Sequence, residues 1–339
     1  MKSKKILLVG PIYFKNGLPA DQMGKFKFQL IKEGYSVESV SNYRNRFLRF
    51  FDIIFYMFFK SYNYNIIIIQ CFSFKAFILE DIASLIGIFL NKKIIFTIRG
   101  GAFMDFYEKH PNWVKRVFKR ANYITSPSLF LKEALELKGH KILHISNFID
   151  IERFEFKNKK EENGKILWVR AFHKLYRPEL AIESFKILKE KYPNFSLTMV
   201  GPDQGEQEKT VQLINKYNLT NSISIVGMVN NDLLPDFYYS HSVFITTTQF
   251  ESFGVAIFEA ASSGIPMVST SVGEIPFLWK NEYDILLSDG TPLDFANKIS
   301  KILENKILSL KLSKNARLNA EKYTWDSIKY KWINLLEII

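Results

Sequence analysis

Two glutamates eight positions apart, Glu251 and Glu259, stand at a turn and in the helix predicted after it. Ser252 would cap this helix, and Gly254 would let a ligand approach the backbone of its first turn. The amides that would bind an anion there are those of Phe253, Gly254 and Val255. Glu259 would reach a hydroxyl pair beside that anion, and Glu251 would reach a second polyol from the loop. Phosphate, ribose and sugar together indicate a nucleotide sugar, although two such glutamates also suit a solvated helix start.

Strands alternate with amphipathic helices along the chain, which predicts parallel α/β layers. Strands are predicted at residues 5–10, 35–41, 66–70, 93–98, 123–125, 141–145, 166–169, 196–200, 222–226, 242–246 and 266–269. Helices are predicted at residues 21–33, 75–90, 129–138 and 179–192, and from 293 onwards. The charged, turn-forming stretch 155–165 interrupts this pattern. We therefore expect two doubly wound domains that face each other across a cleft, with ligands beyond the carboxyl ends of the strands.

The composition narrows the class of protein. The chain has 339 residues, of which 47% are hydrophobic and 24% charged, so it can bury full cores and is not disordered. Its one cysteine, Cys71, excludes a disulfide framework and a thiolate zinc site, and indicates a reducing cytoplasm. We expect no signal peptide, because the first apolar run is short, and no apolar run approaches the ~20 residues of a membrane span.

The positive charge is concentrated in the first half of the chain. Residues 1–150 carry 23 Lys and Arg against 11 Asp and Glu, whereas the remainder carries 23 of each. This predicts an anionic partner for the first half, with a solvated lysine-rich surface as the alternative. Residues 44–59 combine arginines with phenylalanines, which suits either a helix on an anionic membrane or a core helix with a basic end. No RNA-binding motif or groove-reading helix is present, so no nucleic acid is expected as a partner.

The segment around the two glutamates is similar to a known signature. It resembles the E-x7-E motif of retaining family 4 glycosyltransferases, with Glu251 and Glu259 in the glutamate positions. Residues 264–268 and 273–276 continue the family pattern, and residues 147–150 resemble its N-G-[VI]-D segment. A further loop resembles the one that meets the nucleobase, and it consists of Gly227, Met228 and Val229.

The resemblance implies a GT-B fold, an α/β architecture of two Rossmann-like domains. We expect an acceptor domain over residues 1–155, a nucleotide-sugar donor domain over 156–322, and a helix over 323–339 that returns to the first domain. The family's diphosphate clamp is an arginine and a lysine after the first strand of the second domain. Arg170 fits the arginine, and Lys174 is preferred for the lysine, with Arg177 as the alternative. The other interpretation of these cations is surface charge on a loop.

The first domain departs further from the family pattern. A single glycine, Gly17, stands where many members carry a Gly-Gly loop, and it would admit the donor phosphate. Arg99, followed by Gly100, stands where many members place a histidine. Arginine is not a base at ordinary pH, so we expect Arg99 to hold a phosphate or carboxylate of donor or acceptor.

The implied activity is retaining transfer of a hexose from a UDP- or GDP-sugar to an acceptor of a cell-surface glycan, with a lipid-linked acceptor as one option. No D-x-D pair is present, so metal-independent transfer without a cofactor is expected. The alternatives are another GT-B activity, such as a nucleotide-sugar epimerase, and a non-catalytic nucleotide-sugar binding module. The expected location is the cytoplasm, or peripherally the inner face of its membrane, and the oligomeric state stays open.

Overall fold

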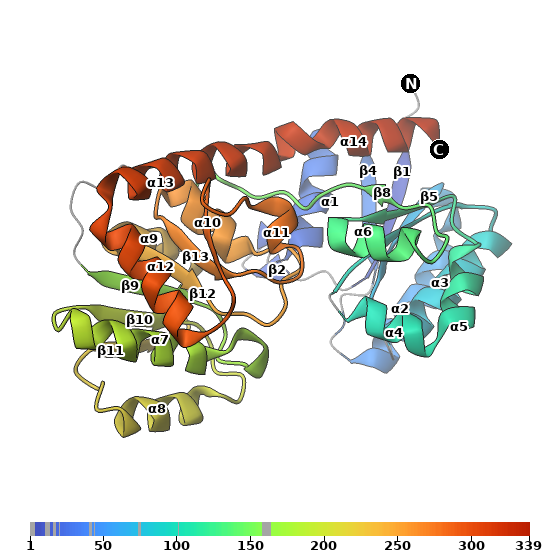
Figure 1. The fold of residues 1–339 in the computed structure, drawn as a ribbon. Coiled ribbons are helices and arrows are strands. Elements are labelled where there is room, and N and C mark those ends of the chain that lie inside the picture. The colour runs from blue at the N-terminus through green and yellow to red at the C-terminus, as the bar shows by residue number, and fades with distance from the viewer. Residues whose placement is uncertain are drawn as a thin grey trace. The chain divides into compact units, whose positions relative to one another are not determined.

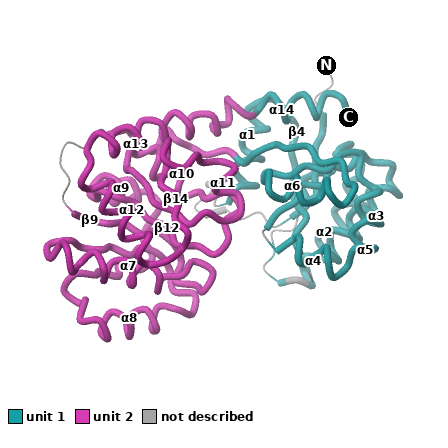
Figure 2. The backbone as a smooth tube through the Cα atoms, viewed as in Figure 1, with its two compact units in different colours: residues 1–147, 329–339 teal, residues 148–328 magenta. Residues whose placement is uncertain are grey.

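The computed structural model describes residues 4–10, 14–15, 18–19, 21–40, 43, 45–73, 76–100, 102–157 and 164–339. Gly17 and Arg44 lie outside these ranges. The chain divides into two compact units, which Figure 2 colours separately. Unit 1 comprises residues 1–147 and 329–339, and unit 2 comprises residues 148–328.

Unit 1 is built on a parallel sheet of six strands in the order β4-β1-β5-β6-β7-β8 (Figure 1). Its strands are β1 Lys5–Val9, β4 Ser36–Val40, β5 Ile66–Cys71, β6 Lys93–Ile98, β7 Tyr123–Ser126 and β8 Leu143–His144. Its helices are α1 Gln22–Lys32, α2 Arg46–Phe59, α3 Phe77–Phe89, α4 Phe103–Lys109, α5 Pro111–Phe118 and α6 Leu129–Glu136. Two short strands, β2 Phe14–Lys15 and β3 Leu18–Pro19, form an antiparallel pair.

Unit 2 repeats the plan with the strand order β11-β10-β9-β12-β13-β14. Its strands are β9 Lys165–Val169, β10 Ser196–Val200, β11 Ile223–Gly227, β12 Val243–Thr246, β13 Met267–Thr270 and β14 Leu286–Ser288. Its helices are α7 Pro178–Lys191, α8 Gln207–Lys216, α9 Leu234–Ser240, α10 Val255–Ser263, α11 Ile275–Leu278, α12 Pro292–Glu304 and α13 Lys306–Ala320. The eleven predicted strands are confirmed with shifts at their ends, whereas β14 and the β2–β3 pair are additional.

The central strands explain why the sheets form. Every residue of β5, whose sequence is IIIIQC, is buried, as expected of a strand that is covered on both faces. In unit 2, Ile166, Leu167 and Trp168 of β9 are fully buried in the same way. Each sheet changes direction of winding between two neighbouring strands, β1 and β5 in unit 1 and β9 and β12 in unit 2. In open α/β sheets, ligands bind beyond the carboxyl ends of the strands at such a switch point.

The last helix, α14 Trp325–Ile338, begins in unit 2 and continues into unit 1. Within unit 1, the ring of Trp332 lies 4.6 Å from the ring of Phe26, and Lys329 forms an ion pair with Glu33 at 3.2 Å. No helix in the described ranges combines the length and apolar character that crossing a membrane requires.

Candidate active site

The switch point of unit 2 brings together two of the predicted site residues. Arg170 follows β9, and Glu251 follows the polar residues at the end of the neighbouring strand β12. Nη2 of Arg170 donates to Oε2 of Glu251 in an ion pair whose side chains are only 13% and 12% exposed. The predicted cation and the first predicted glutamate therefore form one cluster where ligands bind in this class of sheet.

Arg170 is held firmly and still has an unused donor. Its guanidinium lies 5.4 Å from the ring centre of Tyr176, and its buried Nε has no hydrogen-bond partner among the described residues. Its backbone fits against Gly201, where a Cβ would lie 1.8 Å from the Arg170 carbonyl oxygen. Only glycine at position 201 permits this approach. The close packing of the two backbone segments therefore fixes the position from which the Arg170 side chain extends.

The loop after Arg170 is fastened to the end of β12. The hydroxyl of Thr247 donates to the carbonyl oxygens of Tyr176 and Arg177 at 2.7 and 2.9 Å, and the amide of Gln249 donates to Leu175 O at 2.8 Å. The Lys174 side chain is exposed. Arg177 instead donates through Nη2 to Gly290 O at 3.3 Å, beyond the end of β14, and lies 3.9 Å from Glu179.

The start of α10 differs from the prediction by two residues. Gly254, not Ser252, is the N-cap, because its φ of 85° turns the chain into the helix in a left-handed conformation that favours glycine. The Glu251 carboxylate occupies the turn: Oε1 accepts from the amides of Ser252 and Phe253 at 3.1 and 3.4 Å. The amides of Gly254 and Val255 have no acceptor within the described part of the chain. Two of the three predicted anion-binding amides are thus unsatisfied.

Glu259 lies inside α10 and is held by a residue from α9. The hydroxyl of Tyr238 donates to Oε2 of Glu259 at 3.0 Å. Burial, and then the charge of Glu259, raise the pKa of Tyr238 well above its ordinary value, while Arg170 acts in the opposite direction. At neutral pH the hydroxyl therefore keeps its proton and donates to the carboxylate.

The predicted nucleobase loop ends β11. Gly227 has a φ of 78°, and its carbonyl oxygen accepts from the amide of Gly201 at 2.8 Å. Met228 is 73% exposed, whereas Val229 packs on the apolar cluster below α10. The loop is therefore anchored to the backbone beside Arg170 and presents one apolar side chain to solvent.

Arg99 lies at the carboxyl end of β6 in unit 1. Its Nη1 donates to Oδ1 of Asn147, and its buried Nε has no hydrogen-bond partner among the described residues. Burial lowers the pKa of Arg99 to about 10, against the opposing effect of Asp21, so the guanidinium remains charged at neutral pH. Gly100 follows with a φ of 87° and is exposed. The structure supplies a cation at this edge of the sheet.

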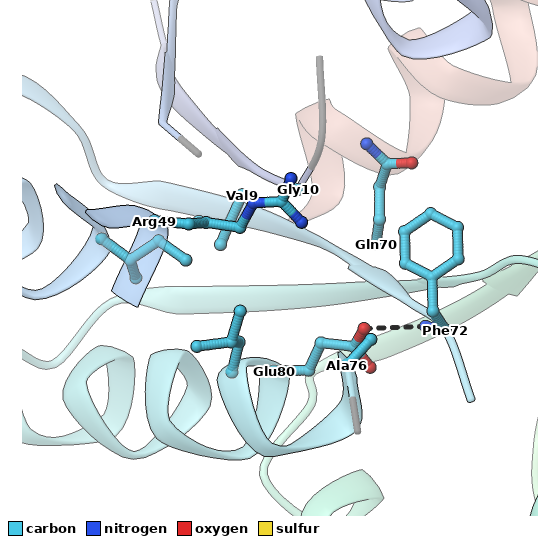
Figure 3. A pocket seen from close by; sticks show the side chains of 9 residues that line it. Val9, Gly10, Arg49, Gln70, Phe72, Ala76 and Glu80 are labelled. Atoms are coloured by element: carbon cyan, nitrogen blue, oxygen red, sulfur yellow. Dashed lines mark hydrogen bonds between the residues drawn. The ribbon is translucent and has the colours of Figure 1, made fainter. Parts of the chain in front are cut away.

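A pocket of about 240 Å³ lies at the switch point of unit 1 (Figure 3). Its lining comes from the ends of β1 and β5, from the first two turns of α2 and from the start of α3, namely Val9, Gly10, Arg49, Ile53, Gln70, Phe72, Ala76, Leu79 and Glu80. Glu80 is 5% exposed: Oε1 accepts from the amide of Phe72 at 2.8 Å, and Oε2 has no partner within the described ranges. Burial raises the pKa of Glu80 well above its ordinary value, against the opposing effect of the hydrogen bond from the Phe72 amide.

The sequence did not predict a role in either site for three residues, Tyr238, Tyr176 and Glu80. Tyr238 and Tyr176 resemble any aromatic residue of a core, and no local pattern marks them. The signal for Glu80 is its place beside Asp81 in the otherwise apolar helix FILEDIASLIGIF. Asp81 is neutralised by Arg120 and Arg116, whereas Glu80 has no cation partner in the described ranges. Those ranges contain no group of three or more His, Cys, Asp or Glu that could hold a metal ion.

Comparison with known proteins places the chain in a family. The family described as glycosyl transferases group 1 matches residues 150–319, half of the chain, and the chain belongs to it. A poly(ribitol-phosphate) alpha-N-acetylglucosaminyltransferase of Staphylococcus aureus is 27% identical over 200 residues, covering 57% of this chain and 39% of that protein. A D-inositol 3-phosphate glycosyltransferase of Salinispora arenicola is 26% identical over 175 residues, covering 49% and 39%. The chain spans about half or less of the length of the curated relatives that it matches.

Solved structures confirm the predicted fold class. HepE of Anabaena, in complex with UDP, matches with a TM-score of 0.79 at 16% identity, covering 99% of this chain and 100% of that one. Sucrose-phosphate synthase of Thermosynechococcus elongatus matches with a TM-score of 0.77 at 18% identity, covering 98% of each chain. The two parallel six-stranded sheets are those of the GT-B fold.

Proposed function

We propose that this protein transfers a sugar from a nucleotide sugar to an acceptor and retains the configuration at the anomeric carbon. The observation that carries the proposal is the Arg170–Glu251 pair at the switch point of unit 2, beside unsatisfied amides at the start of α10. Arg170 and those amides would bind the diphosphate. Glu259, positioned by Tyr238, would bind the ribose, and Glu251 would bind the donor sugar.

In the proposed reaction, the bond from the anomeric carbon to the phosphate oxygen breaks as the acceptor oxygen bonds to that carbon. The acceptor's proton passes to the leaving phosphate oxygen, so the step needs no side chain as base. Arg170 stabilises the charge that develops on the diphosphate, which is the contribution expected of a fixed cation in a partly buried site. Glu251 leaves Arg170 for the sugar when the diphosphate takes its place.

For the acceptor, we propose a hydroxyl of a cell-surface glycan or of its lipid-linked precursor, bound by unit 1 in the cytoplasm. One relative is named as an alpha-N-acetylglucosaminyltransferase of poly(ribitol-phosphate), which supports a polymeric acceptor. The pocket beside β1 and β5 suits a hydroxylated group, because Oε2 of the Glu80 carboxyl lines it without a hydrogen-bond partner in the described ranges. Arg99 supports the same half of the proposal as a cation for a phosphate.

The test begins with calorimetry against UDP, GDP and ADP, with UDP first because the HepE structure contains it. Arg170→Ala should weaken binding of the preferred diphosphate about tenfold to a hundredfold, since a hydrogen bond to a charged group contributes about 1.5–3 kcal/mol. Lys209→Ala, which removes an exposed cation of α8, is the control and should bind normally.

Product analysis then separates transfer from the alternatives. Proton NMR of the reaction with the matching nucleotide sugar should show a new glycoside with the anomeric configuration of the donor. An isomerised nucleotide sugar would identify an epimerase instead. Tight binding without turnover of any donor and acceptor pair would identify a binding module. A product of inverted configuration would refute retention.

A further inference from the structure

Two neighbouring helices of unit 1 present a run of large apolar side chains to solvent. We call it the α2–α3 surface, and it consists of Phe47, Leu48, Phe51, Phe55, Phe58 and Phe59 from α2 and Ile78, Leu85, Ile88 and Phe89 from α3. All ten are at least 43% exposed, and Phe47 and Phe89 are 78% exposed. Scattered exposed apolar residues are normal on proteins, but a contiguous set of this size marks an interaction surface.

The surface is continuous and distinct from the core. Ring contacts join Phe51 to Phe55 and Phe55 to Phe59 at 6.3 and 5.9 Å, and Phe58 meets Phe89 of α3 at 6.1 Å. The opposite side of α2 is buried, with Ile53 and Met57 2% and 0% exposed. The core-helix alternative for residues 44–59 thus describes the buried face of α2, and the exposed face leaves the membrane alternative open.

The charge around the α2–α3 surface selects the partner. Residues 43–93 contain seven Lys and Arg against three Asp and Glu. Two of those three acids, Glu80 and Asp81, are buried at 5% and 9% exposure, so they add little negative charge to the surface. Lys60, directly after Phe59, is exposed. An aromatic face bordered by cations is complementary to a bilayer of anionic lipids, where each basic group near the surface contributes to binding.

We propose that the α2–α3 surface docks on an anionic lipid bilayer, with its phenylalanine rings among the headgroups and the neighbouring cations against the lipid phosphates. The helix lies in the interface, because α2 has 14 residues. At about 1.5 Å per residue it is too short for a hydrocarbon core of about 30 Å. The first turns of the same two helices line the pocket of unit 1. If the proposed function holds, docking places that pocket near lipid headgroups, where a lipid-linked acceptor is found.

Vesicle sedimentation tests the proposal without any donor or activity. The full chain is mixed with vesicles of phosphatidylcholine alone or with phosphatidylglycerol added, at low and high salt. Binding should require the anionic lipid and fall with salt, since charges are screened within about 8 Å at physiological ionic strength. A triple variant, Phe51→Ser with Phe55→Ser and Phe59→Ser, should bind at least tenfold more weakly, a loss of about 1.4 kcal/mol or more.

A matched control removes exposed apolar residues from elsewhere. Leu137→Ser with Leu293→Ser and Ile307→Ser replaces side chains that are 88%, 59% and 83% exposed, and it should bind vesicles like the unchanged protein. Equal losses in the two triple variants would overturn the proposal, because general surface hydrophobicity would then explain the binding. Gel filtration and circular dichroism show that both variants stay folded.

A fluorescent probe locates the contact. The chain's one cysteine, Cys71, is 0% exposed, so a second cysteine at an exposed position can be labelled selectively. An NBD label on Phe55→Cys should shift to the blue and brighten on anionic vesicles, whereas the label on Leu137→Cys should not change. Absence of vesicle binding at low salt, or self-association in solution that the Phe51, Phe55 and Phe59 replacements abolish, would overturn the proposal. The second result would assign the surface to another copy of the chain and would leave the proposed sugar transfer intact.

Discussion

Replacing Tyr238 by Phe removes a hydroxyl of the cluster in unit 2 that contacts Oε2 of Glu259 and, at the longer distance of 3.4 Å, the carbonyl oxygen of Ala256. Tyr238 is 0% exposed, and its hydroxyl donates to Oε2 of Glu259 at 3.0 Å. Phenylalanine preserves the ring and its packing but removes this donor. The carboxylate of Glu259 then loses the group that positions it. If Glu259 binds the ribose, the variant should bind nucleoside diphosphate more weakly while remaining folded.

The size of the effect follows from the exposure of the pair. A hydrogen bond to a charged group contributes about 1.5–3 kcal/mol. Because Glu259 is partly exposed, solvent screens it, and the lower end of that range, about 1.5 kcal/mol, applies to stability. For a unit of this size that loss lowers Tm by about 3–6 °C. The affinity loss should be smaller, about threefold to tenfold or 0.7–1.4 kcal/mol, because the carboxylate is still present.

Calorimetry with the preferred diphosphate and with its 2′- and 3′-deoxy forms tests whether the loss of affinity in Tyr238→Phe acts through Glu259. Removing the ribose hydroxyl that Glu259 binds should cost less affinity in Tyr238→Phe than in the unchanged protein. Tyr239→Phe is the matched control, because the neighbouring hydroxyl accepts from the amide of Glu155 at 2.6 Å and lies outside the cluster. Unaltered affinity in a folded Tyr238→Phe, or the same deoxy penalty in both tyrosine variants, would refute the reasoning.

Glu251→Gln should abolish sugar transfer but keep diphosphate affinity within about threefold, because in the proposed function the diphosphate would bind Arg170 and not the carboxylate. A product assay beside calorimetry checks this prediction, and parallel losses of transfer and affinity would contradict it. Gly201→Ala should lower the free energy of unfolding by about 3 kcal/mol in urea, since the added Cβ would meet the Arg170 carbonyl oxygen at 1.8 Å. Burial raises the pKa of Asp284 to about 6. In the unfolded chain this carboxyl has its ordinary pKa of about 4, so the folded protein binds the proton more tightly than the unfolded chain does. The free energy of unfolding should therefore decrease as pH rises from about 4 to about 6. Asp284→Asn should flatten the pH dependence of the free energy of unfolding, and an unchanged pH dependence in the variant would contradict this prediction.

The order of strands and helices was predictable because strands buried on both faces are continuous apolar runs. Residues 66–69 are four consecutive isoleucines, and all are at most 3% exposed in β5. The additional β14 has three residues, and β2 and β3 have two each. Segments that short carry no period of their own, and the two-residue β8 was predicted only because apolar residues at 142, 143 and 145 extend its pattern. The pattern of apolar residues along the chain also does not fix the order of strands within a sheet. The two switch points can therefore be located only once the strand order in the structure is known.

The charged residues of the site in unit 2 could be predicted from the sequence, but the contacts between them could not. Arg170 and Glu251 were both candidates, but they are 81 positions apart, and their pairing depends on β9 and β12 being neighbours. Ser252 was a reasonable N-cap by residue type, yet the positive φ of Gly254 decides where α10 begins. Tyr238 could not be found, because a tyrosine in an apolar stripe gives no sign that its hydroxyl meets a carboxylate.

The division of α14 between the two units has a consequence for synthesis. Residues 1–147 leave the ribosome first, but unit 1 also requires residues 329–339. At about 5–20 residues per second, the ~180 residues in between take roughly 10–40 s to make. Throughout that time Phe26 has no Trp332 to pack against, and Leu336, which ends 0% exposed, has yet to be made. The unit that is translated first is therefore the last to be completed, and it matures only after the whole of unit 2 has been synthesised.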